Sequence, residues 1–136
     1  VDVIYVMVGT GEMQSALEWH AKKAGISDRV FFPGFIPNAS QNLPGFDVFV
    51  LPSLKEGTPY VLLEAARVGI PCVATSAIDE SLANDIPHLR IVPTEDSIAL
   101  ADAIQEVSKL PRVTEKQEHL FSLPSMVSGH LALYER

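Results

Sequence analysis

The sequence predicts an α/β fold, a doubly wound, Rossmann-like parallel sheet with helices on both faces. Short apolar runs alternate with stretches of helical periodicity along the chain, which is the pattern of repeated strand–helix units. The runs 46–51 and 72–75 are apolar almost throughout, which is typical of parallel strands covered on both faces. In such a sheet, ligands bind at the carboxyl ends of the strands, near the point where the strand order reverses.

Composition narrows the class of protein. The 136 residues are 47% hydrophobic and 20% charged, which excludes a disordered chain and predicts one domain over residues 1–136. The net charge of −7, without a cluster of Lys or Arg, argues against nucleic acid as a partner. Cys72 is the single cysteine, so we expect no disulfide framework and a reducing compartment. No apolar run reaches about 18 residues, so we expect no transmembrane segment.

The first predicted unit is a strand over residues 3–8, the turn Gly9-Thr10-Gly11, and a helix over about 12–24 that Gly25 ends. We expect the helix to turn an apolar stripe inward: Met13, Ala16, Leu17, His20 and Ala24. A Gly-x-Gly turn after a strand is found in dinucleotide-binding folds, but Gln14 occupies the place of the third glycine. The turn is therefore either a ligand contact or a tight strand-to-helix connection.

A second strand is predicted over 30–33, a short helical turn over 39–43, and a third strand over 46–51. The stretch 52–75 then organises the rest of the chain. Thr58 is predicted to cap a helix that starts with Pro59, and Gly69 to end it. Most positions of this helix are apolar, so we expect burial on most sides, and the polar positions form one stripe at helical spacing: Tyr60, Glu64 and Arg67.

Two carboxylates bracket the start of this helix. Glu56 lies in the loop before it, and Glu64 lies about 7.5 Å along the axis from Pro59. A helix N-terminus favours an anion, so one ligand could place a diphosphate there and a diol against each carboxylate. A nucleotide-sugar has this layout. The ordinary alternatives are a solvated loop acid for Glu56 and an ion pair of Glu64 with Arg67.

The block Glu56-Gly-Thr-Pro-Tyr-Val-Leu-Leu-Glu64-Ala-Ala resembles the Glu-x7-Glu signature of retaining glycosyltransferases with the GT-B fold, especially family 4 (group 1). The similarity covers residues 3–110 well and the remainder loosely. It implies a hexosyltransferase that moves a sugar from a nucleotide-sugar donor to the hydroxyl of a saccharide or lipid-linked acceptor, with retention, in polysaccharide or glycolipid synthesis. No metal or other cofactor is implied, because no carboxylate cluster offers oxygen ligands.

The resemblance also implies roles for particular residues. Glu56 would hold hydroxyls of the donor sugar at the catalytic centre, and Glu64 would hold the ribose diol. Backbone amides over 57–61 would face the diphosphate, although Pro59 contributes none. Further donor contacts are expected from the strand ends and loops: Gly9, Gly11, Phe35, Ile36, Ser53, Gly57, Thr58, Tyr60 and Val61.

Beyond the central helix, we expect strands over 72–75 and 90–92 and a helix from Thr94 to Leu110. Its inward positions are predicted to be Ile98, Ala101, Ile104 and Val107. Residues 76–80 lack the glycine pair that the family has before an acid, although Glu80 is a candidate for that acid. Residues 112–136 are predicted to form a helical tail.

The resemblance implies that the chain is the C-terminal, donor-binding half of such an enzyme and lacks its first strand–helix unit and the N-terminal Rossmann-like domain. We therefore expect the fragment alone to be inactive, with an open sheet edge beside residues 46–51 that favours self-association. The expected location is cytoplasmic, or peripheral at the inner membrane. Two alternatives remain: a non-catalytic nucleotide-sugar-binding module, and a sugar-nucleotide epimerase of the same fold.

Overall fold

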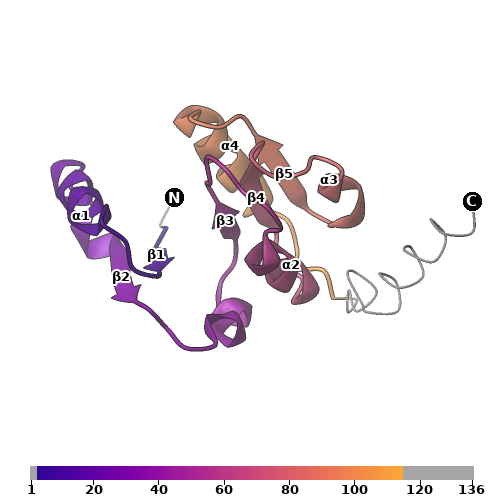
Figure 1. Ribbon diagram of the computed structural model, residues 1–136, viewed down its shortest axis with the longest axis horizontal. Helices are drawn as coiled ribbons and strands as arrows, with labels where there is room; N and C mark the ends of the chain where they lie inside the picture. The colour runs from indigo at the N-terminus through magenta and orange to yellow at the C-terminus, as the bar shows by residue number, and fades with distance from the viewer. Residues whose placement is uncertain (1–2, 115–136) are drawn as a thin grey trace, which may run out of the picture. The chain divides into compact units, whose positions relative to one another are not determined.

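The computed structural model describes residues 3–114, which form two compact units, residues 3–39 and 40–114 (Figure 1). Both units are built from parallel strands connected through helices, as the sequence predicts. Apart from its first three residues, the predicted helical tail over 112–136 lies outside the described residues, and residues 112–114 are not helical.

The first unit contains one strand–helix–strand repeat: β1 (Tyr5–Val8), α1 (Gln14–Lys23), a 3₁₀ turn (Ser27–Arg29) and β2 (Val30–Gly34). β1 and β2 pair in parallel, with Tyr5 opposite Val30. The predicted end of α1 is confirmed. Gly25 has φ +70°, its N–H donates to Lys22 O, and the next N–H donates to Ala21 O, which together form a Schellman motif.

The predicted inner stripe of α1 is largely wrong. Ala21 is the buried residue of the helix, whereas Met13 and Leu17 are 66% and 40% exposed and His20 and Ala24 are also exposed. Of the predicted stripe, Ala16 is half-buried. A sheet of two short strands offers too little apolar surface to cover a full helical stripe. The four side chains of β1 are themselves 37–44% exposed.

The second unit is a three-stranded parallel sheet of order β3-β4-β5 with helices on both faces (Figure 1). Its elements in chain order are a 3₁₀ segment (Ala39–Gly45), β3 (Phe49–Leu51), α2 (Tyr60–Arg67), β4 (Cys72–Thr75), α3 (Leu82–Asp85), β5 (Leu89–Val92) and α4 (Ser97–Val107). β4 is the central strand and is fully buried, which confirms the prediction made from its apolar run. Within the second unit β3 is an edge strand that pairs with β4, and the expected open edge beside residues 46–51 stays a prediction.

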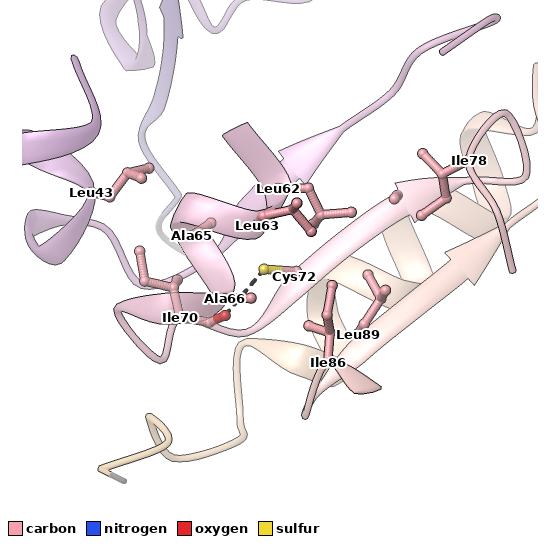
Figure 2. Close-up of a cluster of buried hydrophobic side chains, with 11 residues drawn as sticks. Leu43, Leu62, Leu63, Ala65, Ala66, Ile70, Cys72, Ile78, Ile86 and Leu89 are labelled. Carbon is pink, nitrogen blue, oxygen red and sulfur yellow. Dashed lines mark hydrogen bonds between the residues drawn. The ribbon is translucent and has the colours of Figure 1, made fainter. Parts of the chain in front are cut away.

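Side chains that alternate along β4 build the two cores. Cys72 and Ala74 belong to the cluster that packs against α2 and α3. In this cluster Cys72 lies with Leu62 and Ile86, which are 0% and 2% exposed (Figure 2). Val73 faces α4 and contacts a second cluster that includes Val107. At about 25 cal/mol per Å² of apolar area, these clusters supply the main favourable term in folding this unit. They also fix α2 against the sheet.

The predicted start of α2 is wrong and its predicted end is confirmed. Thr58 makes no side-chain cap, because the buried Pro59 occupies the N-cap position with ψ 73°. At the other end, Gly69 has φ +75°, and its N–H and that of Ile70 donate to Ala66 O and Ala65 O. This Schellman motif stops the helix.

The N-cap of α4 is Asp96 rather than Thr94. Its carboxylate accepts a hydrogen bond from the Ala99 N–H at 2.9 Å. With this register, Ala103 and Val107 are buried and Ile104 is half-buried. The predicted inward positions Ile98 and Ala101 are wrong, because both lie on the exposed side of the helix.

Candidate functional site

The carboxyl ends of β3 and β4 lie at one edge of the sheet, since the two strands are parallel and Leu51 is opposite Ala74. The loop 52–59 leaves β3 at this edge and leads into α2. Thr75, the last residue of β4, donates its hydroxyl to the backbone carbonyl of Ser53 in that loop. The loop is therefore tied to the central strand of the sheet.

Glu56 is oriented by the same loop. Its carboxylate Oε1 accepts a hydrogen bond from the Ser53 hydroxyl at 2.6 Å, a length typical of a charge-assisted O–H···O⁻ bond. Both side chains are half-buried. The structure therefore does not support the alternative of a freely solvated loop acid.

Glu64 lies one turn into α2, four residues after Tyr60, or about 6 Å along the helix axis. It is exposed, together with Tyr60 and Arg67, which confirms the predicted polar stripe. Glu64 is exposed because the core contacts the opposite side of the helix through Leu62 and its neighbours. Within residues 3–114 no ion pair joins Glu64 to Arg67, so that alternative is also not supported.

The other predicted residues near α2 surround its amino end. Gly57 and Thr58 are exposed, and Tyr60 and Val61 are 73% and 40% exposed. The exposure of Val61 corrects the prediction that α2 is buried on most sides. These residues present backbone and side-chain atoms to solvent beside the two carboxylates.

Four predicted donor residues belong to the first unit. Gly9 and Gly11 line an open hollow of about 230 Å³ at the carboxyl end of β1, with Thr10, Met13 and other apolar side chains. Gly9 has φ +121°, which a side chain would rarely allow, and its N–H donates to Gly34 O. Phe35 and Ile36 follow Gly34 but do not line the hollow; Phe35 is 75% exposed and Ile36 is half-buried.

One residue at this edge was not predicted as functional. Thr75 is 4% exposed, and its hydroxyl is the group that connects β4 to the loop of Glu56. The signal in the sequence is a hydroxyl residue that ends an otherwise apolar run. A β-branched residue in a strand is so common that this signal is weak.

Charges near the carboxyl edge are mostly acidic. Asp79 accepts a hydrogen bond from the Ser81 N–H, which holds the pKa of that carboxyl below its ordinary value. Glu80, the candidate for the acid that follows a glycine pair in the resembled family, is exposed in the turn before α3.

No cluster of three or more His, Cys, Asp or Glu side chains in the described part of the chain is arranged to hold a metal ion. None of the helices there has the length and apolarity needed to cross a bilayer.

Comparison with known proteins relates this arrangement to a family. Residues 2–109 match the family model of the glycosyl transferases group 1. The chain is 34% identical, over an alignment of 137 positions, to the putative colanic acid biosynthesis glycosyltransferase WcaL of Escherichia coli, covering 87% of this chain and 34% of that protein. It is 36% identical over 76 residues to the UDP-Gal:alpha-D-GlcNAc-diphosphoundecaprenol alpha-1,3-galactosyltransferase of Escherichia coli, covering 55% of this chain and 20% of that enzyme.

A solved structure extends the similarity to the fold. Anabaena HepE in complex with UDP superposes with a TM-score of 0.74 at 21% identity, covering 96% of this chain and 41% of HepE. The chain thus spans between 20% and 41% of the length of these three proteins. The chain belongs to the glycosyl transferases group 1 and has the Rossmann-like α/β architecture of GT-B glycosyltransferases.

Proposed function

We propose that this chain is the donor-binding half of a retaining hexosyltransferase of family 4, which transfers a sugar from a nucleotide-sugar to a hydroxyl of a saccharide or lipid-linked acceptor. One observation carries the proposal. At the carboxyl edge of β3 and β4, Glu56 is oriented by Ser53, and Glu64 faces solvent one turn into α2. The amino end of α2, which favours an anion, lies between the two acids in sequence. The names of the relatives support a nucleotide-sugar donor, since one contains UDP-Gal and HepE was solved with UDP.

Each acid has a separate role in this proposal. Glu56 accepts hydrogen bonds from hydroxyls of the transferred sugar, and Glu64 accepts them from the ribose diol. Backbone N–H groups of Gly57, Thr58 and Val61 face the diphosphate and stabilise the charge that develops on it as it leaves. Pro59 has no N–H, and the Tyr60 N–H donates to Thr58 O. Ser53, Thr58, Tyr60 and Val61 border this donor site. The donor contacts expected at Gly9, Gly11, Phe35 and Ile36 of the first unit stay a prediction from the sequence.

Catalysis requires more than this chain. In the proposal, the acceptor binds to an N-terminal Rossmann-like domain, so residues 1–136 alone bind donor without transferring sugar. The protein acts in the cytoplasm, or at the cytoplasmic surface of the inner membrane, where nucleotide-sugars and lipid-linked acceptors meet. The products are polysaccharides or glycolipids.

Charge-removing variants of the two acids test the proposal in the full-length protein. Glu64→Gln should weaken the affinity for UDP about ten- to a hundredfold, because a hydrogen bond to a charged group contributes about 1.5–3 kcal/mol. Glu56→Gln should leave UDP affinity unchanged and lower kcat, because its contact is to the sugar. Asp102→Asn is the matched control, since it removes one exposed carboxylate from α4.

Calorimetric titration with UDP and steady-state kinetics with UDP-glucose and UDP-galactose separate these effects. Unchanged UDP affinity in Glu64→Gln would contradict the proposed ribose contact. Donor binding by the full-length protein without transfer or hydrolysis of either sugar would favour the non-catalytic binding module.

A further inference from the structure

Two successive hydrogen bonds lead from Thr75, in the sheet, through Ser53 to the carboxylate of Glu56. Thr75 donates its hydroxyl hydrogen to the Ser53 carbonyl, and Ser53 donates its own hydroxyl hydrogen to Glu56 Oε1 at 2.6 Å. Thr75 is buried at the end of the central strand, and it is 22 residues away from Ser53 in sequence. These two hydrogen bonds therefore connect the central strand β4 to Glu56 in the loop.

The number of hydrogens that the Ser53 hydroxyl can donate limits its hydrogen-bond partners. A serine hydroxyl has one hydrogen to donate, and here that hydrogen is given to the carboxylate. The same holds for Thr75, whose hydrogen is given to the backbone. Neither hydroxyl can donate to a bound sugar without breaking its present bond. Ser53 can still accept a hydrogen bond from a donor hydroxyl, so its direct contact with the donor stays a prediction, and the bond to Glu56 gives it a second role.

The geometry also leaves part of Glu56 available. Oε1 accepts the bond from Ser53, while Oε2 has no protein donor within residues 3–114. A glutamate side chain in a loop has several rotamers, and a hydrogen bond to one oxygen selects among them. A carboxylate held in this way presents its second oxygen to a ligand in one orientation, which lowers the entropy lost on binding.

We infer that Ser53 is a positioning residue that holds the Glu56 carboxylate for the transferred sugar, and that Thr75 anchors Ser53 to β4. This inference rests on the proposed function, since it assigns a partner to the residue placed at the reacting sugar. It predicts an effect on turnover and none on binding of the nucleotide.

The variants are chosen to remove one hydroxyl at a time. Ser53→Ala removes the bond to Glu56, and Thr75→Val removes the anchor while keeping the β-branched shape. Ser53→Thr and Thr75→Ser keep a hydroxyl and are the rescue variants. Ser76→Ala is the matched control, because Ser76 is exposed beside Thr75 and its side chain makes no hydrogen bond in the described residues.

The full-length variants are assayed with UDP-glucose and UDP-galactose for kcat and KM, and with UDP by calorimetry. We expect Ser53→Ala to lower kcat about tenfold, the effect of one hydrogen bond to a charged group, with UDP affinity within about twofold of the wild type. Thr75→Val should act in the same direction, and both rescue variants should restore kcat. An unchanged kcat in Ser53→Ala would overturn the inference. A loss of UDP affinity would also overturn it, because Ser53 would then bind the nucleotide directly.

A second measurement needs no donor. Methylene ¹³C relaxation of Glu56 in the ligand-free protein reports the order of its side chain, which should fall in Ser53→Ala and remain unchanged in Ser76→Ala. Equal order in both variants would show that Ser53 does not hold Glu56. Absence of UDP binding and of turnover in the wild type would instead contradict the proposed function, so the two failures are distinguishable.

Discussion

Replacing Gly69 by Ala should destabilise the second unit by about 1.5–3.5 kcal/mol. Part of this cost is the left-handed backbone at φ +75°, which for a residue with a Cβ amounts to about 1–2 kcal/mol. The rest comes from Val113, whose carbonyl oxygen lies 2.1 Å from the position of the new Cβ. Real Cβ contacts are essentially never shorter than 3.0 Å, so the two backbones must separate by about 0.9 Å. This separation breaks the bond from the Val113 N–H to Gly69 O, now 3.0 Å, at a cost of about 0.5–1.5 kcal/mol.

Gly25→Ala is the matched control. Gly25 ends α1 with the same motif and φ +70°, but a Cβ there would meet no atom within 4 Å. The control should therefore lose only the conformational contribution of the left-handed backbone, about 1–2 kcal/mol. Urea unfolding followed by circular dichroism gives both free energies of unfolding. Equal losses in the two variants would refute the argument that the contact with Val113 stabilises this turn.

Three further predictions concern the second unit. Leu62→Ala should lower the free energy of unfolding by about 2–5 kcal/mol in urea titrations, because Leu62 is fully buried against β4. Asp96→Ala should cost about 1 kcal/mol in the same assay while Thr94→Ala costs less, since Asp96 caps α4; equal losses would show that the cap was misassigned. Burial raises the pKa of the Cys72 thiol from 9.0 to about 12, so folding favours the protonated thiol. This contribution to stability is fully present below pH 9 and is lost as the pH rises from 9 towards 12. Native protein should therefore resist iodoacetamide at pH 8 and react on unfolding in urea, whereas rapid labelling of the native protein would contradict the burial.

Much of the second unit could be predicted because β3 and β4 are almost entirely apolar and the turn after α2 carries glycine and proline. β4 was predicted with both bounds correct, and Gly69 was predicted to end α2. The helix starts were less predictable. Thr58 and Thr94 are plausible caps by residue type, but Pro59 and Asp96 occupy the N-cap positions. Residue type gives the preference, while backbone geometry decides which of two neighbouring candidates is used.

The candidate site also has features that could be predicted from the sequence and features that could not. The spacing of Glu56 and Glu64 around a helix start is visible in the sequence, and so is the polar stripe that contains Glu64. The exposure of Val61 was not predictable, because it depends on which side of α2 contacts the sheet. The role of Thr75 was also hidden, since its partner Ser53 is 22 residues away and is contacted through its backbone carbonyl. A contact to a backbone carbonyl does not depend on the side chain of its partner, so no pattern in the sequence predicts it.

A crystal structure of the full-length protein with UDP tests the proposed donor site. The ribose hydroxyls should lie about 2.5–3.0 Å from the Glu64 carboxylate, and the diphosphate should lie at the amino end of α2. Glu56 should keep its bond to Ser53, with its second oxygen facing the space beyond the diphosphate. UDP bound away from the carboxyl edge of β3 and β4, or bound there without contact to Glu64, would contradict the proposed donor site.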